Sequence, residues 1–264
     1  MAETKKVNKD FIKDLVARTS FNEQILTKDY YLTKILYLIK DVEGIYFKGG
    51  TALQKIFLNY SRLSEDIDFT IPKDVRQKEK EIQEILKTQD FVKKIEKGKS
   101  VDKFVRMIIY YANFSGEEDK IFIDLNERAK LLTKPEKYEI KHFYEGIIPS
   151  FYINTLSKKE IIAEKVAAAI GRNKPRDHFD IYQIIKKNIP IDMKLVKKKC
   201  EQSGNEFSII KMFNKANKLK HRWDSDMVPL LAEEISFEEV MKTLSKHFKL
   251  KEEKEKIKNK IKAL

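Results

Sequence analysis

The sequence predicts an α+β fold, in which a mixed β-sheet is flanked by helices and followed by a mainly helical C-terminal part. Runs of β-branched and aromatic residues between turn residues predict the strands. These runs occupy residues 45–47, 66–71, 104–111 and 120–126. Apolar residues at helical spacing predict helices before and between the runs. Beyond residue 157 helical spacing dominates, and this predicts the change of architecture.

Two helices are expected before the first strand, over residues 8–19 and from Asn22 or Thr27 to Val42. Each carries its apolar side chains on one face, which predicts packing under the sheet. A third, strongly charged helix is expected over residues 73–97. No pattern in the first two helices indicates chemistry. The lysines at the end of the charged helix are interpreted as a solvated face, with contact to a nucleic acid backbone as the alternative.

Two glycines and a threonine follow the first predicted strand. Adjacent glycines let the backbone turn where a Cβ would clash, and they let a ligand approach closely. Thr51 is expected to be the N-cap of the helix that follows. A helix N-terminus offers unpaired N–H groups and a partial positive charge. The turn Gly49-Gly50-Thr51 is therefore a candidate phosphate site.

Two carboxylates alternate with apolar residues in the strand at residues 66–71. Because side chains alternate along a strand, Asp66 and Asp68 share the face opposite to Ile67. Two like charges this close are costly without a cation, and Mg²⁺ binds carboxylate and phosphate oxygens together. Two such ions can hold the attacking and leaving oxygens of a displacement at phosphorus. An acidic pair exposed on a sheet edge is the structural alternative.

The strands at residues 104–111 and 120–126 are expected to pair as a hairpin beside the acidic strand. Asp124 lies in an apolar run of the second strand, where an unpaired carboxylate would be costly. An aspartate at a strand end that leads into Asn126 is the structural alternative for this residue.

The order of these residues resembles a known enzyme motif. Gly49-Gly50-Thr51, a helix and Arg62-x-Ser64-x-Asp66-x-Asp68 resemble the first motif of the DNA-polymerase-β-like nucleotidyltransferase superfamily. Their particular form resembles the AbiEii/AbiGii toxin family, the nucleotidyltransferase toxins of bacterial abortive-infection toxin–antitoxin systems. The resemblance implies a nucleotidyltransferase-like catalytic domain over residues 1–154. A helical C-terminal domain is expected over residues 155–264.

The resemblance also implies roles for these residues. Asp66 and Asp68 would be catalytic and would bind Mg²⁺, together with Asp124 as a third carboxylate from a neighbouring strand. The nucleoside triphosphate would be bound mainly by the turn and by the residues before the acidic strand, namely Lys48, Gly49, Gly50, Thr51, Arg62 and Ser64.

A lysine in the C-terminal part is a further candidate phosphate ligand. Ser157-x-x-Glu160 is a capping box that opens a helix to about Gly171. Lys165 lies among alanines in this helix, and an ammonium suits a triphosphate as a point charge. The alternative is a lysine whose stem covers the core and whose charge lies in water.

A new helix is expected from Pro175, and acidic residues near its start suit the helix dipole. That would explain Asp177 and Asp180 as structural. The AbiEii-like family, however, has a lysine in one helix followed by Arg-Asp-x-x-Asp, and Lys165 with Arg176-Asp177-His-Phe-Asp180 matches. By this resemblance Lys165 and Asp177 are catalytic. Lys165 would bind the nucleotide phosphates, and Asp177 would position Lys165, the metal or the acceptor.

The composition favours a phosphate-rich partner, because the 264 residues carry a formal net charge of +13. A lysine-rich chain that is merely soluble is the alternative. The single cysteine, Cys200, excludes an internal disulfide and a cysteine-based zinc site. The first six residues form no apolar leader, and no run reaches membrane-spanning length, so a cytoplasmic location without a membrane partner is expected.

We therefore expect a Mg²⁺-dependent nucleotidyltransferase that transfers a nucleoside monophosphate from a nucleoside triphosphate to an RNA acceptor. The resemblance implies the tRNA 3′ end as the acceptor and a cognate antitoxin protein as a partner. Two alternatives remain open. One is an NTP-dependent phosphotransferase that acts on a protein partner, and the other is a non-catalytic nucleic-acid-binding protein.

Overall fold

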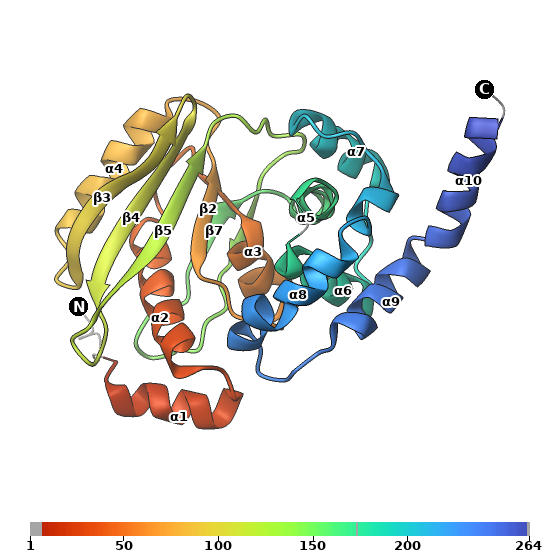
Figure 1. Cartoon of the computed structure of the whole chain (residues 1–264). Coiled ribbons are helices and arrows are strands. Elements are labelled where there is room, and N and C mark those ends of the chain that lie inside the picture. Colours follow the sequence, from red (N-terminus) through yellow and green to blue (C-terminus); the bar gives the residue numbers. More distant parts are fainter. Residues whose placement is uncertain (1–6, 173, 263–264) are drawn as a thin grey trace. The chain divides into compact units, whose positions relative to one another are not determined.

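A computed structural model of the chain describes residues 7–172 and 174–262 (Figure 1). These residues divide into two compact units. The first extends to Lys158 and includes Leu230–Ala232, and the second comprises Lys159–Pro229 and the residues from Glu233 onward. The existence of a catalytic and a C-terminal domain that meet after residue 154 stays a prediction. The six residues on which the absence of a leader was argued lie outside the described part.

A single seven-stranded sheet forms the centre of the first unit, with the strand order β3-β4-β5-β2-β1-β7-β6. The strands β2 and β5 pair in parallel, as do β1 and β7, and the other neighbours are antiparallel. The predicted mixed sheet of an α+β fold is therefore confirmed. The strands are β1 (Tyr46–Lys48), β2 (Asp66–Thr70), β3 (Val92–Val101), β4 (Phe104–Ala112), β5 (Glu118–Asn126), β6 (Glu136–Glu139) and β7 (Tyr152–Thr155).

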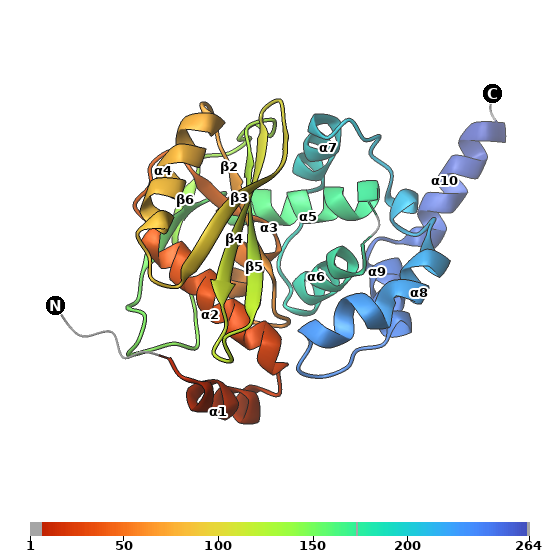
Figure 2. The same ribbon diagram turned by 60° about the vertical axis from the view of Figure 1, so that its left-hand side comes forward.

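The two faces of the sheet differ in burial. In β4 and β5 buried apolar residues alternate with partly exposed ones, as expected of strands with one face in the core. Helices α2 (Glu23–Leu38) and α4 (Val75–Lys87) cover the buried face (Figures 1 and 2). Tyr31 of α2 packs there on Tyr111 of β4, with ring centroids 4.2 Å apart. We call this the inner face of the sheet and the opposite one its outer face.

The helices at the start of the chain match the prediction closely. Helix α1 (Lys9–Thr19) begins after Asn8, whose side chain accepts a hydrogen bond from the backbone N–H of Phe11. Helix α2 begins after Asn22, which caps it in the same way. The helix ends at Leu38 and not at Val42 as predicted.

The prediction of one charged helix over residues 73–97 is wrong. Helix α4 ends at Lys87, and Val92 begins the strand β3. This strand pairs with β4 at the sheet edge, where Ile95 lies opposite Ile109. Its lysines suit an exposed edge strand, because charged side chains prevent pairing with another chain. Tertiary pairing therefore overrides the local helical pattern.

The second unit is helical, as predicted for this part of the chain. The basic segment from Met193 to Leu219 is not one helix, and Gly204, with a φ of +67°, lies in the break. Trp223 is 4% exposed and donates a hydrogen bond to the carbonyl of Ile235, so it belongs to the core. The helices are α5 (Lys158–Arg172), α6 (Pro175–Lys186), α7 (Met193–Gln202), α8 (Ala216–Met227), α9 (Phe237–His247) and α10 (Leu250–Lys262).

Helix α6 is the centre of the second unit and packs against α8 and α9. Its buried apolar residues are Phe179, Ile181 and Ile184. In the part of the chain that the structure describes, every helix is too short or too polar to cross a lipid bilayer.

Candidate active site

The glycine turn lies at the end of β1, where the chain passes directly into a helix. Helix α3 (Gly49–Ala52) begins at Gly49 and continues as a π-helix over Leu53–Leu58. The prediction that Thr51 is the N-cap is therefore wrong, because the helix begins two residues earlier. The Thr51 hydroxyl instead donates a hydrogen bond to the carbonyl of Asp66. It thereby joins the turn to the acidic strand.

Gly49 lies directly against one of the predicted catalytic carboxylates. A Cβ at this position would lie 2.2 Å from Oδ2 of Asp68, and the backbone has a φ of +79°. Both observations require glycine, since side chains need more room and rarely adopt a positive φ. The turn and the carboxylate therefore meet at one point.

Gly50 lies against the residues that precede the acidic strand. A Cβ here would lie 2.8 Å from Nη2 of Arg62 and 3.3 Å from Oγ of Ser64. Arg62 is 1% exposed and donates to the carbonyl of Leu63 at 2.8 Å. The guanidinium group thus supports the turn from the protein side. That Arg62 and Ser64 bind a nucleotide stays a prediction.

A buried lysine anchors the helix that follows the turn. Lys55 pairs with Asp29 of α2 at 2.7 Å and donates to the hydroxyl groups of Thr33 and Tyr60 at 2.8 and 2.7 Å. Burial lowers the pKa of Lys55, while the charge of Asp29 acts in the opposite direction. No local sequence pattern predicted this group, because its members come from separate elements. It fixes the π-helix on α2 and so holds the turn in place.

The predicted carboxylates share the outer face of the sheet. Strands β2 and β5 pair in parallel with Asp68 opposite Asp124 and Asp66 opposite Phe122. Lys48 of β1 lies opposite Asp68 on its other side. Residues in register on neighbouring strands point to the same face. The hairpin beside the acidic strand is therefore confirmed, and it brings Asp124 next to Asp68.

Asp124 has a partner that the sequence did not indicate. Arg106 of β4 lies opposite it and donates from Nε and Nη2 to its two carboxylate oxygens, at 2.7 and 2.6 Å. This hydrogen bond raises the pKa of Arg106, and the charges of Asp66 and Asp68 act in the same direction. Alternation places Arg106 on the outer face, but only the hairpin register shows which carboxylate it meets.

The donor set on this face is suitable for a hard divalent cation. Asp66 and Asp68 present carboxylate oxygens, the ligands that Mg²⁺ prefers, beside a turn that fits phosphate. Within residues 7–172 and 174–262, no three His, Cys, Asp or Glu side chains are grouped as a metal site. The residue types of Asp66 and Asp68 suit the ion, and metal binding by Asp66, Asp68 and Asp124 stays a prediction.

The remaining predicted residues, Lys165 and Asp177, meet within the second unit. The Lys165 ammonium on α5 lies 3.0 Å from Asp177 and 2.9 Å from Asp180, both on α6. The Lys165 side chain is 7% exposed, so its charge is held by carboxylates and not by water. Arg172 also donates to both oxygens of Asp177. The expected contact between Lys165 and Asp177 is present, and their catalytic roles stay predictions.

The charge of Asp177 is set by these neighbours. Burial alone would raise the pKa of this carboxyl, but the Lys165 and Arg172 cations more than offset it and hold the pKa below its ordinary value. Asp177 is therefore ionised throughout the physiological pH range. Pro175 at the start of α6 and the acidic first turn confirm the predicted helix start.

A second buried lysine in the same unit was not predicted. Lys199 of α7 lies 2.6 Å from Glu160 and 2.9 Å from Glu164, both on α5. Lys199 lies in a run of lysines that suggests a solvated surface, yet it is 3% exposed. Only the packing of α7 on α5 identifies which lysine of the run is buried.

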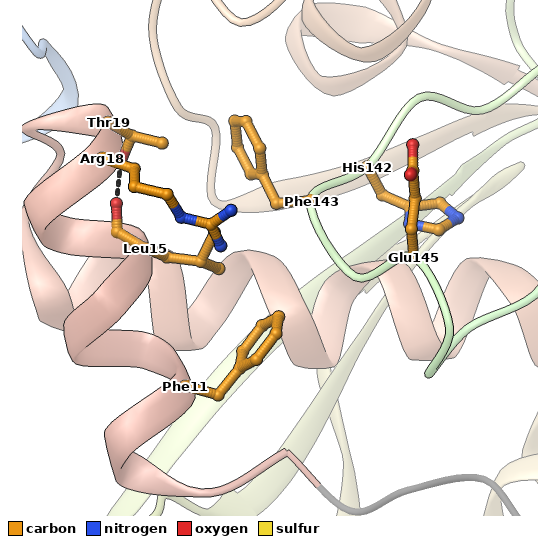
Figure 3. A pocket seen from close by; sticks show the side chains of 7 residues that line it. All are labelled: Phe11, Leu15, Arg18, Thr19, His142, Phe143 and Glu145. Carbon is orange, nitrogen blue, oxygen red and sulfur yellow. Dashed lines mark hydrogen bonds between the residues drawn. The ribbon is translucent and has the colours of Figure 1, made fainter.

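A pocket of about 380 Å³ lies elsewhere in the first unit, between α1 and residues 142–145 (Figure 3). Its aromatic lining includes Phe11, Phe143 and His142, and its charged lining includes Arg18 and Glu145. None of the predicted site residues lines it, so it is separate from the glycine turn and the carboxylates.

Comparison with known proteins agrees with this geometry. The model of the family described as "Nucleotidyl transferase AbiEii toxin, Type IV TA system" matches residues 31–245. The search of curated proteins found no match. Among solved structures, MenT4, a nucleotidyltransferase toxin from Mycobacterium tuberculosis, is similar with a TM-score of 0.65 and 17% identity. The similarity covers 92% of this chain and 89% of MenT4.

JHP933 from Helicobacter pylori is similar with a TM-score of 0.55 and 22% identity, over 92% of this chain and 98% of JHP933. At these identities the two structures support the fold, and the family match supports the activity. The match spans both the glycine turn with its carboxylates and the pair Lys165 and Asp177. The chain therefore belongs to the AbiEii family of nucleotidyltransferase toxins of type IV toxin–antitoxin systems.

Proposed function

We propose that this enzyme transfers a nucleoside monophosphate from a nucleoside triphosphate to the 3′ end of a tRNA in a Mg²⁺-dependent reaction. The contact between Gly49 and Asp68 is the observation that carries this proposal. It joins a turn suited to phosphate with a carboxylate suited to a divalent cation. The net charge of +13 supports a nucleic acid as the acceptor.

In this proposal the glycine turn binds the triphosphate. The first N–H groups of α3 at Gly49, Gly50 and Thr51 would bind phosphate oxygens, and Lys48 would add a positive charge. Arg62 and Ser64 would hold the turn in the conformation that binds the nucleotide.

Asp66 and Asp68 would hold Mg²⁺, with Asp124 as a third ligand. The bound cation supplies charge stabilisation at the oxygens of the phosphorus that reacts. The acceptor hydroxyl oxygen forms a bond to the α-phosphorus, while the bond to pyrophosphate breaks. The protein contributes mainly position and electrostatic stabilisation to such a transfer.

Lys165 would bind the phosphates of the same nucleotide, and Asp177 would position it. The ammonium is already oriented by Asp177 and Asp180, so little rotamer entropy would be lost on binding. Arg172 fixes Asp177 in turn. We propose that residues 1–154 form the catalytic domain and that residues 155–264 form a helical domain that contributes these two residues.

We also infer a cellular context from the family. The enzyme would act in the cytoplasm as the toxin of an abortive-infection system that defends against phage. A cognate antitoxin protein would neutralise it.

A labelling experiment tests the reaction. The protein is incubated with Mg²⁺, total RNA and each nucleoside triphosphate labelled at the α-phosphate. Asp66→Asn removes one predicted ligand, and Asp102→Asn changes an exposed aspartate of a turn as the matched control. Label in a tRNA-sized band that is lost only in Asp66→Asn supports the proposal.

Absence of label from RNA with all four nucleotides would refute the RNA acceptor. Label transferred from the γ-phosphate to a protein would then identify the phosphotransferase alternative. RNA binding that is equal in the wild type and in Asp66→Asn, without any transfer, would identify the non-catalytic alternative.

A further inference from the structure

The outer face of β3, β4 and β5 carries aromatic rings between cations. The Arg106 guanidinium carbon lies 5.0 Å from the centroid of the Phe122 ring, and the Lys120 ammonium lies 5.7 Å from it. On the neighbouring strands the Lys94 ammonium lies 4.2 Å from the centroid of Tyr110. We define this outer-face patch as Lys94, Arg106, Ile108, Tyr110, Lys120 and Phe122.

The pairing register makes the patch continuous. Ile108 lies opposite Phe122, and Tyr110 lies opposite Lys120 on one side and Lys94 on the other. Phe122, Ile108 and Tyr110 are half-buried, although the core of this unit lies on the inner face. A solvated face of an antiparallel sheet is ordinarily polar, so three apolar or aromatic side chains in a row are unusual there.

Two of the three cations of the patch, Lys94 and Arg106, have acidic partners, and Lys120 is the third. Arg106 is paired with Asp124, and Glu96 is the nearby acid on β3. Glu96 lies 3.0 Å from Lys94 and accepts a hydrogen bond from the Tyr110 hydroxyl at 2.9 Å. Lys120 is exposed. Aromatic faces with basic side chains around them are the combination that binds single-stranded nucleic acid, because bases stack while cations meet the backbone.

The position of the patch relative to the carboxylates decides what it would bind. The sheet order places β1 and its glycine turn on one side of β2, and β5 and β4 on the other. In an in-line displacement the attacking oxygen and the leaving pyrophosphate lie on opposite sides of the phosphorus. With pyrophosphate at the glycine turn, the acceptor approaches from the side of β5, where Phe122 lies opposite Asp66.

We propose that the outer-face patch binds the unpaired bases at the 3′ end of the RNA acceptor, with Phe122 as the main stacking surface. The exposed Lys120 ammonium meets the RNA backbone, while the pair with Asp124 holds Arg106 beside the ring. This inference rests on the proposed function, because it uses the direction of the transfer. It adds a positioning surface that lies beyond the predicted catalytic and nucleotide-binding residues.

Binding without turnover tests the proposal. The affinity for a single-stranded RNA labelled at its 5′ end is measured by fluorescence anisotropy, without nucleotide, and compared with that for a blunt RNA duplex. Phe122→Leu keeps apolar volume without a ring, and Phe122→Tyr keeps the ring. Tyr152→Ala removes an aromatic residue that is 53% exposed on β7 and serves as the matched control.

We expect Phe122→Leu to weaken single-strand binding about tenfold, with little effect on the duplex. Phe122→Tyr and Tyr152→Ala should bind as the wild type does. Lys120→Gln should reduce the slope of log affinity against log salt by about 0.7, as for the loss of one phosphate contact. Equal single-strand affinity of Phe122→Leu and the wild type would overturn the proposal, provided that both have the same thermal midpoint.

Steady-state kinetics separates the acceptor from the nucleotide. Phe122→Leu should raise KM for the RNA and leave KM for the triphosphate unchanged. The reverse pattern would mean that the ring stacks on the base of the triphosphate, and the proposal would be wrong. If the wild type transfers no nucleotide but Phe122→Leu still loses single-strand binding, the stacking surface stands and the transferase reaction fails.

Discussion

Gly49 and Asp68 occupy positions so close that a Cβ on residue 49 would lie 2.2 Å from the Asp68 carboxylate. The two residues are far apart in the motif and belong to different elements, α3 and β2. Their contact joins the turn to the acidic strand. A substitution at either residue should therefore disturb both the phosphate site and the metal site.

Gly49→Ala should lower the rate of transfer about a hundredfold while the protein stays folded. The new methyl group would displace the Asp68 carboxylate, and a misplacement of about 1 Å lowers catalysis about a hundredfold. The positive φ adds about 1–2 kcal/mol of backbone strain. Transfer assays and thermal unfolding measure the two effects.

Gly116→Ala is the matched control for Gly49→Ala. Gly116 has a φ of +83°, but a Cβ at this position would have no atom within 4 Å, so the variant shares the strain without the clash. It should lose similar stability and keep its activity. Equal activity of both variants would contradict the role of the contact.

Asp68→Asn should abolish Mg²⁺ binding and therefore lower the transfer rate about a thousandfold. An amide keeps the shape of the side chain but lacks the negative charge that holds the cation. Calorimetric titration of the protein with Mg²⁺ provides a readout independent of turnover. Binding of Mg²⁺ that persists unchanged in Asp68→Asn, with Asp102→Asn as the control, would show that the cation binds elsewhere.

Lys165→Met should have two effects. It should raise KM for the triphosphate, and it should lower the free energy of unfolding. Removal of the cation leaves Asp177 and Asp180 with one partner fewer in a buried site, which costs about 3–5 kcal/mol. Steady-state kinetics below the unfolding transition of the variant measures KM for the folded enzyme.

Lys199→Met separates stability from nucleotide binding. Lys199 is buried to a similar extent and also pairs with two carboxylates, Glu160 and Glu164. It should lose a similar free energy of unfolding and keep the wild-type KM. If both variants had the same KM, Lys165 would be a structural residue only.

Asp177→Asn should remove part of the acid sensitivity of the protein. The pKa of Asp177 is lowered in the folded state, so the unfolded chain takes up the proton first as pH falls. The stabilisation is complete above the ordinary aspartate pKa of about 3.9 and is lost as pH falls from there toward the lowered folded value. Urea unfolding between neutral pH and about pH 3 measures this loss as a change in slope.

The asparagine variant should be less stable at neutral pH by about 3 kcal/mol and should depend less on pH below about 4. Asp226→Asn is its control, because Asp226 pairs with the half-exposed Arg222 one helical turn away. That exposed pair contributes under about 1 kcal/mol. An unchanged acid slope in Asp177→Asn would contradict the pKa argument.

Much of the fold followed from local patterns. Several features could be predicted because each depends on residues only a few positions apart. They are the helix starts near Asn8, Asn22 and Pro175, and the alternation of Asp66 and Asp68 with apolar residues. The end of α4 could not be predicted from the sequence. Residues 92–97 have a charge pattern that also suits a helix, and their pairing with β4 decides the outcome.

The sequence by itself determined the glycine turn, the acidic pair and the two helices that carry Lys165 and Asp177, because these features are set by short-range spacing and backbone preference. Only the tertiary structure decided that Arg106 binds Asp124, that Lys55 and Lys199 are buried and that Phe122 lies beside the carboxylates. These contacts join residues from separate elements. Their partners are fixed by strand register and helix packing, which no local spacing encodes.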